Sequence, residues 1–450
     1  MILKKIYFIG INGIGMSGLA KIMKMKGFEV LGADLSRSYA TEELENMGIK
    51  VYNCHDEKNM EGVDTVIASS AIKDSNPEYA YAVRNNIKIV KRGELLGTLI
   101  NLATGIAVAG THGKTTTSSM LSACMVSKDP TIAVGGILPE IGSNARPGSS
   151  EYFIAEADES DNSFLYMTPS YSIVTNIEAD HLENHGSLEN IKKSFAKFLD
   201  QTTKEAIVSF DCKNIREVIE NRENITTYSI KNSDADIFAK NIVIKDAKTE
   251  YTVIINGESI GEFAISIPGM HNVSNSLPVI YLSHKFGVEI SEIKRALLCF
   301  KGAKRRYDIL YNNNGIKIID DYAHHPTEIA ATLQGAKSIE KNEIIAIFQP
   351  HRYSRVKFLL DKFQGCFQGV EQVLLLPIYS AGEKNIYDVN LEMLKNEINH
   401  ENITIIEDQN DIMKVINSCK EDKVFLFMGA GNISGFAHEI VEKLEKNENI

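Results

Sequence analysis

A buried strand that runs into a glycine loop and then into a helix constrains the fold of this chain more than any other feature. The apolar run Ile106-Ala107-Val108-Ala109 leads into Gly110-Thr111-His112-Gly113, and Lys114-Thr115-Thr116 open the helix. Backbone N–H groups at such a turn can hold phosphate oxygens, and the positive end of the helix dipole adds to that attraction. Lys114 would reach the terminal phosphates, and the Thr115 hydroxyl would bind Mg²⁺. The segment predicts a nucleotide triphosphate site, although Val108 stands where the full phosphate-loop motif has its first glycine.

Strand-like and helix-like segments alternate along the chain, a pattern typical of parallel α/β units. A chain of 450 residues is too long for one ordinary core. We therefore predict three units, at residues 1–102, 103–300 and 301–450, with linkers near residues 97–105 and 298–304 acting as hinges. The predicted strands are residues 5–9, 29–31, 63–68, 87–90, 106–109, 152–155, 172–175, 316–319, 344–348, 373–376 and 424–428. A β-rich stretch at residues 235–267 surrounds the turn Asn256-Gly257.

A second glycine loop, close to the N-terminus, has the spacing of a dinucleotide site. Gly13-Ile14-Gly15-Met16-Ser17-Gly18 matches G-x-G-x-x-G after a strand, and Asp34 ends the next strand. Taken alone, this match favours an NAD(P) enzyme. The physics requires only a diphosphate at the helix N-terminus, so a nucleotide-sugar diphosphate fits equally well. Close packing of strand against helix, with no ligand at all, is the third interpretation.

Polar side chains gather where the predicted strands end, which is the edge at which open α/β sheets bind ligands. Glu156-Ala157-Asp158-Glu159-Ser160-Asp161 follows one strand, and Thr175-Asn176-Ile177-Glu178-Ala179-Asp180-His181 follows the next. Four neighbouring carboxylates repel one another unless a cation lies among them, and Mg²⁺ is the natural candidate. In the third unit, Asp320–Pro326 and Phe348–Arg355 carry histidines and arginines that suit a carboxylate or phosphate ligand. We assign no ligand to the glycine turn Met428–Asn432.

The bulk composition excludes several classes of protein. A formal net charge of −11 argues against a nucleic-acid-binding protein, which would need a basic face. No stretch approaches the roughly 18 apolar residues of a membrane helix, so we expect no membrane insertion. The six cysteines are scattered, which is typical of a reduced protein with buried thiols. We therefore expect a cytoplasmic protein and leave its oligomeric state open.

Together, these motifs resemble those of the Mur ligases of bacterial peptidoglycan synthesis, in family order and over essentially the whole chain. The resemblance implies an N-terminal Rossmann-like domain for the UDP-sugar, a central P-loop ATPase-like domain and a C-terminal Rossmann-like domain for the amino acid. It is strongest to the members that use ATP and Mg²⁺ to join L-alanine to the lactyl carboxylate of UDP-N-acetylmuramate through an acyl phosphate. The chain departs from the family pattern at Asn12, which replaces a loop glycine, and at Ala33, which replaces a serine.

The resemblance also implies roles for individual residues. The UDP-sugar site would comprise Gly13, Gly15, Ser17, Asp34, Ser69, Ser70 and Arg92. The ATP site would comprise Gly110, Thr111, His112, Gly113, Lys114, Thr115, Thr116, His271, Asn272, Asn275, Arg306 and Asp321. The L-alanine site would comprise Tyr322, His324, His351, Arg352 and Arg355, and the metal ligands would be Thr115, Glu159 and His181. Lys114, Glu159, His181 and His324 would take part in catalysis, with His324 orienting or deprotonating the amine.

Three other interpretations remain open at this point. A recycling ligase of the same family attaches a ready-made peptide to the sugar, but its third-domain motif differs from His351-Arg352-Tyr353-Ser354-Arg355. An NAD(P)-dependent oxidoreductase would explain the first glycine loop and Asp34, but not the second loop or the pair Glu159 and His181. A non-catalytic ATP-binding switch would explain the second loop alone.

Overall fold

The computed structural model describes residues 4–69, 71–139, 141–245, 248–419 and 421–448. The chain divides into two units. The first unit comprises Met1–Glu178, Glu189–Ile237 and Pro278–Ala296, and the second comprises Ala179–Leu188, Phe238–Leu277 and Leu297–Ile450.

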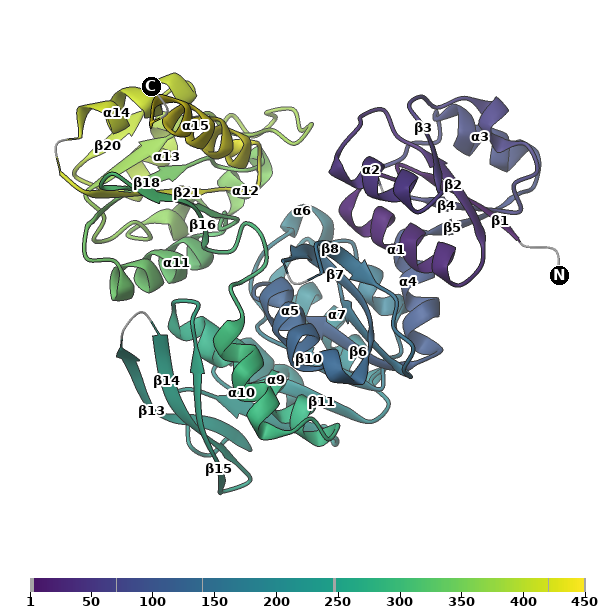
Figure 1. The fold of residues 1–450 in the computed structure, drawn as a ribbon, viewed down its shortest axis with the longest axis horizontal. Coiled ribbons are helices and arrows are strands. Elements are labelled where there is room, and N and C mark those ends of the chain that lie inside the picture. The colour runs from purple at the N-terminus through teal and green to yellow at the C-terminus, as the bar shows by residue number, and fades with distance from the viewer. Residues whose placement is uncertain (1–3, 70, 140, 246–247, 420, 449–450) are drawn as a thin grey trace. The chain divides into compact units, whose positions relative to one another are not determined.

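The first unit begins with a parallel five-stranded sheet in the order β3-β2-β1-β4-β5 (Figure 1). Its strands are β1 (Lys5–Ile9), β2 (Glu29–Ala33), β3 (Lys50–Tyr52), β4 (Thr65–Ala68) and β5 (Lys88–Lys91). Its helices are α1 (Ile14–Met25), α2 (Tyr39–Asn46), α3 (Pro77–Arg84) and α4 (Arg92–Asn101), and η1 (Glu57–Met60) is a short 3₁₀ turn. The central position of β1 explains its apolar run, because strands flank it on both sides and Tyr7, Phe8 and Ile9 are fully buried.

The first predicted linker is wrong over residues 97–101. These residues complete α4, and β6 (Thr104–Ala109) begins three residues after the helix ends. Gly97 allows close packing of this helix. A Cβ at Gly97 would lie 2.6 Å from the carbonyl oxygen of Tyr166 in η3 (Ser163–Tyr166), so only glycine lets the helix approach so closely.

The second sheet of the first unit carries the phosphate loop. Seven strands of this ten-stranded sheet lie in the first unit, in the order β12-β11-β10-β6-β9-β7-β8, and neighbours among them pair parallel except β7 with β8. The other strands are β7 (Thr131–Leu138), β8 (Ser143–Arg146), β9 (Tyr152–Glu156), β10 (Tyr171–Val174), β11 (Glu205–Ser209) and β12 (Ile225–Ser229). The helical segments here are α5 (Lys114–Cys124), η2 (Val126–Lys128), α7 (Leu188–Asp200), α8 (Lys213–Ile219) and α10 (Ile290–Cys299). Strand β6 is central, so the loop that follows it lies in the middle of the ligand-binding edge.

The predicted β-rich stretch forms three strands, β13 (Ile237–Lys245), β14 (Lys248–Ile255) and β15 (Glu258–Ile265). Strands β14 and β15 pair antiparallel across Asn256-Gly257. Both turn residues have positive φ, +49° and +84°, as a two-residue type I′ hairpin requires. Helix α9 (Met270–Lys285) follows this stretch, and α6 (Leu182–His185) is a single turn in the second unit.

The C-terminal sheet has six strands in the order β16-β17-β21-β18-β19-β20. They are β16 (Asp308–Asn313), β17 (Ile316–Asp321), β18 (Glu343–Phe348), β19 (Gln372–Leu375), β20 (Ile403–Ile405) and β21 (Lys423–Met428). The helical segments are α11 (Pro326–Ile339), α12 (Tyr353–Phe358), η4 (Leu360–Phe363), α13 (Leu391–Ile398), α14 (Gln409–Ser418) and α15 (Ile433–Glu448). Only β16 pairs antiparallel, with β17.

Helices cover both faces of the C-terminal sheet (Figure 1), which explains why its inner strands β18 and β21 are almost entirely apolar. The edge strand β16 is more polar. Residues 344, 346 and 348 of β18 pack on the side of α11, α12 and α13, whereas Ile345 and Ile347 pack on the side of α14 and α15. All six cysteines are free thiols, but Cys54 and Cys299 are exposed, so the expectation of buried thiols is wrong for these two. None of the described helices is long and apolar enough to span a bilayer.

Candidate active site

The phosphate loop takes the backbone path that its glycines allow. Gly110 has φ +136° and Gly113 has φ +82° at the N-cap of α5. A Cβ at Gly110 would overlap Oγ1 of Thr175, so the loop can lie against the segment after β10 only because this residue is glycine. Lys114, Thr115 and Thr116 form the first turn of α5, as predicted.

Asn176 holds the phosphate loop from the side. Its Oδ1 accepts a hydrogen bond from the His112 backbone N–H at 2.9 Å, and its Nδ2 donates to the His112 carbonyl at 3.0 Å. The backbone of Asn176 also accepts from Thr111 at 3.0 Å, and Thr111 Oγ1 accepts from Glu178 N at 2.8 Å. These backbone and side-chain hydrogen bonds therefore fix the positions of Thr111 and His112.

Lys114 lies inside the loop and faces the acidic cluster. Its ammonium donates to the carbonyl oxygens of Gly110 at 2.6 Å and Thr111 at 3.1 Å, and to Glu159 Oε1 at 2.9 Å. Burial lowers the pKa of Lys114, but the carboxylates of Glu159 and Glu156 outweigh it, so the net pKa is raised and the group stays a cation. Burial is also the main reason that the pKa of Glu159 is raised, against the opposing effect of Lys114.

The acidic cluster after β9 supplies oxygen atoms beside the loop. Both carboxylate oxygens of Glu156 accept from Thr115 Oγ1, at 3.0 and 3.1 Å, and Oε2 also accepts from Gly135 N at 2.8 Å. Burial raises the pKa of Asp158, but Lys114, Ser160 and Arg92 lower it further, so this carboxylate stays ionised. Thr115 contacts Glu156, and Glu159 pairs with the neighbouring Lys114. Thr115, Glu156 and Glu159 each offer oxygen atoms of the kind that Mg²⁺ selects.

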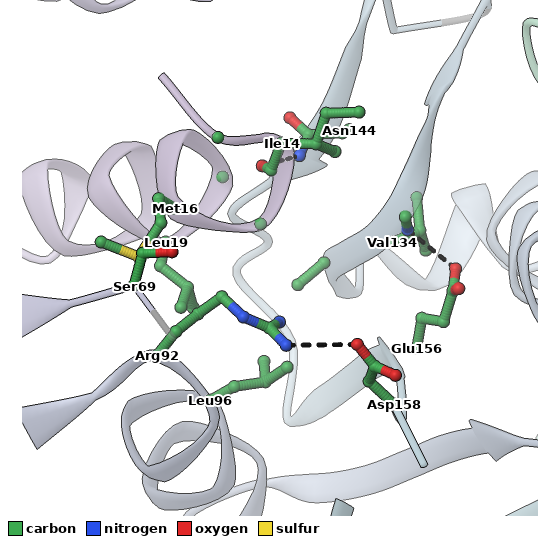
Figure 2. Close-up of a pocket in the computed structure, with 15 residues that line it drawn as sticks. Ile14, Met16, Leu19, Ser69, Arg92, Leu96, Val134, Asn144, Glu156 and Asp158 are labelled. Carbon is green, nitrogen blue, oxygen red and sulfur yellow. Dashed lines mark hydrogen bonds and ion pairs between the residues drawn. The ribbon is translucent and has the colours of Figure 1, made fainter. Parts of the chain in front are cut away.

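A cavity of about 350 Å³ joins the first glycine loop to this cluster (Figure 2). Arg92 lies in it, with Nη2 3.5 Å from Asp158 Oδ2, and Asn144 Nδ2 donates to the Ile14 carbonyl at 2.5 Å. The lining residues are Gly13, Ile14, Gly15, Met16, Gly18, Leu19, Ser69, Arg92, Leu96, Ala133, Val134, Gly135, Asn144, Glu156 and Asp158. The cavity thus brings together Gly13, Gly15, Ser69 and Arg92, all predicted for the UDP-sugar, with carboxylates beside the phosphate loop.

Ser17 and Asp34 are absent from the described lining of this cavity. Ser17 is buried and donates through Oγ to the Ile14 carbonyl at 3.0 Å. Asp34 accepts from Asn12 N at 3.0 Å, so it supports the turn of the first loop. The Asn12 side chain, one of the departures from the family pattern, donates to the Ser36 carbonyl. Ser70, also predicted for the UDP-sugar, lies outside the described residues.

In the second unit, a row of four rings contains three of the residues predicted for L-alanine. Tyr322 meets His324 edge-on at 5.3 Å, His324 meets His351 at 5.9 Å, and His351 stacks on Tyr379 at 5.6 Å with 10° between the planes. The guanidinium carbons of Arg305 and Arg306 lie 4.9 and 5.0 Å from the centre of the Tyr322 ring. Sequence reasoning missed Tyr379, which comes from the segment after β19.

The two histidines are neutral and carry opposite tautomers. His324 Nδ1 is 2.9 Å from the Tyr322 carbonyl, which only accepts, so Nδ1 carries the hydrogen and Nε2 is an acceptor. His351 Nδ1 is 3.1 Å from Arg355 Nη1, which only donates, so Nδ1 accepts and Nε2 carries the hydrogen. Burial, helped by Arg355, lowers the pKa of His324 to about 3 and that of His351 to about 4. A histidine with so low a pKa can orient an amine through a hydrogen bond, but it cannot hold a proton taken from that amine at neutral pH.

The two arginines predicted for the carboxylate of L-alanine differ in their availability. Arg355 is 6% exposed and binds Asp180 through two hydrogen bonds, Nε to Oδ1 at 3.2 Å and Nη2 to Oδ2 at 3.3 Å. Burial raises the pKa of Asp180, but Arg355 outweighs it and holds the pKa well below its usual range. Arg352 has φ +69° and a side chain 34% exposed, with Nη1 3.4 Å from Glu183 and 3.5 Å from Glu383. The Arg352 side chain is therefore more accessible to a ligand than the Arg355 side chain.

The residues predicted for the adenine side of ATP are ordered by local hydrogen bonds. Asn272 Nδ2 donates to the Pro268 carbonyl at 2.7 Å, and Asn275 Nδ2 donates to Asn272 Oδ1 at 3.3 Å. Burial, followed by the charge of Arg306, lowers the pKa of His271 to about 4. Asp321 accepts from the backbone N–H groups of Tyr307 and Ala323, both at 2.8 Å, yet burial raises its pKa to about 6.

His181 lies beside the carboxylates of the α6 turn. Its ring nitrogens are 3.5 Å from Glu183 and 3.7 Å from Asp180, and its backbone φ is +50°. It belongs to the second unit, whereas Thr115 and Glu159 belong to the first. Its metal role stays a prediction.

Family comparisons decide the class of protein. Residues 5–104 match the description "Mur ligase family, catalytic domain", residues 108–283 match "Mur ligase middle domain", and residues 305–431 match "Mur ligase, glutamate ligase domain". The chain belongs to the Mur ligase family. A Mur ligase from Fusobacterium nucleatum subsp. nucleatum, named UDP-N-acetylmuramate--L-alanine ligase, is 62% identical over 98% of this chain and 97% of its own length. A relative of the same name from Persephonella marina is 40% identical over 99% of this chain and 98% of its own length.

The three-domain α/β fold predicted from the sequence is confirmed, because solved Mur ligase structures share it. The UDP-N-acetylmuramate-alanine ligase of Thermotoga maritima aligns with a TM-score of 0.83 at 31% identity, over 98% of this chain and 99% of that one. A murein peptide ligase from Psychrobacter arcticus aligns with a TM-score of 0.73 at 22% identity, over 98% of each chain, and this likeness shows the fold alone.

Proposed function

We propose that this Mur ligase joins L-alanine to the lactyl carboxylate of UDP-N-acetylmuramate, with hydrolysis of ATP to ADP and phosphate. The observation that carries the proposal is the cavity that the first glycine loop shares with the carboxylates beside the phosphate loop. A nucleotide-sugar diphosphate bound at Gly13 and Gly15 would direct its sugar towards the terminal phosphate of ATP. The 62% identity to a relative with this activity in its name supports the choice of substrates.

The reaction requires activation because a carboxylate is a poor electrophile. A lactyl carboxylate oxygen would attack the γ-phosphorus, and the bond to the β,γ-bridging oxygen would break to give ADP and an acyl phosphate. The neutral amine of L-alanine would then attack the acyl carbon. The tetrahedral intermediate would collapse with cleavage of the bond between the acyl carbon and the phosphate oxygen, and the proton lost by nitrogen would go to the departing phosphate. None of these steps needs a protein nucleophile, so positioning and charge neutralisation would supply most of the catalysis.

Lys114 would neutralise charge where carboxylate and triphosphate meet. Its raised pKa keeps it cationic, and its contacts with Gly110 and Thr111 anchor it inside the loop that would hold the phosphates. Thr115, Glu156 and Glu159 would hold Mg²⁺, together with the predicted His181. When bound, Mg²⁺ would polarise the phosphoryl oxygens.

L-Alanine would bind along the row of rings in the second unit. Arg352 would pair with the α-carboxylate, and the Nε2–H of His351 would donate to the same group. His324 would accept a hydrogen bond from the amine through Nε2 and so aim the nitrogen lone pair. It would not act as the base, because its pKa of about 3 is too low to hold a proton at neutral pH.

Three domains would divide these tasks, with boundaries at residues 102 and 300. The first would hold the UDP-sugar, the second would hold ATP with help from His271, Asn272, Asn275, Arg306 and Asp321, and the third would hold L-alanine. Closure of the third domain on the other two would bring the substrates together.

Phosphate release tests the proposal against its alternatives. Purified protein with ATP and Mg²⁺ should release phosphate only when both UDP-N-acetylmuramate and L-alanine are present, and the product should gain the mass of one alanine residue. Lys114→Ala supplies the background rate. Release that ignores both substrates would favour an ATP-binding switch, consumption of a nicotinamide would favour an oxidoreductase, and a strict need for a peptide in place of L-alanine would favour the recycling ligase.

A further inference from the structure

The glycine turn Met428–Asn432 has no part in the proposed reaction, yet it packs against a side chain that contacts the amino-acid site. A Cβ added to Gly431 would lie 2.7 Å from Cγ and 2.9 Å from Cβ of Tyr379, and would overlap Oε1 of Gln349. Real Cβ atoms are not found so close to a neighbouring ring, so Gly431 provides the space in which the Tyr379 ring lies.

Tyr379 is tied to His351 by both backbone and ring. Its N–H donates to the Pro350 carbonyl and its carbonyl accepts from Arg352 N, both at 2.8 Å, so its backbone brackets His351 on either side. Its ring lies parallel to the His351 ring at 5.6 Å. The hydrogen bond from Arg355 holds His351 Nδ1, and the His324 ring meets the imidazole edge-on from another side at 5.9 Å. The Tyr379 ring packs along the face of the imidazole and resists its tilting, so these contacts together fix the direction of Nε2–H.

We propose that Tyr379 is a positioning residue of the amino-acid site, and that Gly431 is a glycine because the Tyr379–His351 stack requires it. This inference rests on the proposed function, in which His351 Nε2–H donates to the α-carboxylate of L-alanine. Tyr379 acts through His351, and its hydroxyl has no part in the effect.

The test measures KM for each of the three substrates, together with kcat, in a set of matched variants. Tyr379→Ala removes the ring and keeps the backbone bracket, so KM for L-alanine should rise about three- to tenfold, the size expected for one aromatic pair. KM for ATP and for UDP-N-acetylmuramate should stay within about twofold, since neither substrate meets this ring. Tyr379→Phe keeps the stack and should match the wild type.

Gly431→Ala should raise KM for L-alanine in the same way, because the added methyl displaces the Tyr379 ring. In a Tyr379→Ala background the same change should add little to KM for L-alanine, since the ring through which it acts on His351 is gone even though Cβ of residue 379 remains. Gly435→Ala is the matched control, because a Cβ there meets nothing within 4 Å, and it should leave all three KM values unchanged.

An unchanged KM for L-alanine in Tyr379→Ala would overturn the inference, as would an equal rise for all three substrates. Fully additive effects of the two changes would mean that Gly431 acts through Gln349, and would also overturn it. A wild-type protein that fails to turn over UDP-N-acetylmuramate with L-alanine would instead refute the proposed function. If Gly431→Ala lowers the melting temperature too far for assay, KM for L-alanine in Tyr379→Ala alone decides the test.

Discussion

Replacing Asn176 with alanine should weaken the use of ATP without touching any atom that would contact ATP. The side chain makes two hydrogen bonds to the backbone of His112, at 2.9 and 3.0 Å, and so fixes the middle of the phosphate loop. Alanine removes both and leaves the His112 N–H without that partner. Thr175 Oγ1 still donates to the His112 carbonyl, so the loop loses one side of its support and not all of it.

The magnitude follows from the number of bonds lost. Each hydrogen bond contributes about 1 kcal/mol net, so ordering the loop without Asn176 costs about 2 kcal/mol. If that cost falls on ATP binding and on the transition state, kcat/KM for ATP should drop about 30-fold, at about 1.4 kcal/mol per factor of ten. Asn176→Asp keeps the acceptor for His112 N–H but turns the donor towards His112 O into a second acceptor, so it should be at least as impaired.

Steady-state kinetics with ATP varied and both other substrates saturating measures this loss. Asn385 is the matched control, because its side chain also clamps a backbone, donating to the Val389 carbonyl at 2.8 Å and accepting from Val389 N at 3.3 Å. Asn385→Ala should lower stability to a similar extent and leave kcat/KM for ATP unchanged. The reasoning is refuted if Asn176→Ala keeps its ATP kinetics, or if both variants lose them equally.

Three further predictions concern single side chains. Gly110→Ala should lower turnover at least about 100-fold, because the loop must move away from Thr175, whereas Gly257→Ala also has positive φ but open space and should keep its rate. His324→Asn should flatten the pH dependence of stability. The pKa of His324 in the folded protein, about 3, lies below its value in the unfolded chain. Neutral His324 therefore stabilises the fold above the unfolded pKa, and this stabilisation is lost on acidification. Between pH 4 and 6, the slope of unfolding free energy against pH should be smaller in the variant by about 1.4 kcal/mol per pH unit. Asp180→Asn leaves the buried Arg355 without its counter-charge and should cost about 3–5 kcal/mol in chemical denaturation, and a cost near zero would contradict the account of this pair.

The fold could be predicted wherever the local pattern is strong. Strands β1, β6, β18 and β21 are central and covered on both faces, so each is a continuous apolar run that is visible in the sequence. Strand β8, Ser143-Asn144-Ala145-Arg146, has no such run and was not predicted. It is a strand because it pairs with the preceding strand β7 and packs on α1, and the contact with α1 is distant in sequence. The linker was wrongly predicted to include residues 97–101 of α4, and one contact of that helix, Gly97 with the Tyr166 carbonyl, is likewise distant in sequence.

The site was predictable where chemistry follows directly from a motif. Lys114, Thr115, Arg92 and His351 belong to recognisable segments, and the structure brings them beside suitable partners. Tyr379 and Asn176 act through contacts with residues far away in the sequence, and no spacing rule identifies them. The difference between Arg352 and Arg355 also depends on such a contact, because Asp180, 175 residues from Arg355, decides which arginine is free.

The transfer of oxygen from the sugar to phosphate tests the central claim most directly. UDP-N-acetylmuramate would be labelled with ¹⁸O in both oxygens of its lactyl carboxylate and converted completely with ATP, Mg²⁺ and L-alanine. If the carboxylate is activated as an acyl phosphate, each molecule of inorganic phosphate carries one labelled oxygen, and the amide product retains the other. Unlabelled phosphate accompanied by full turnover would contradict the account.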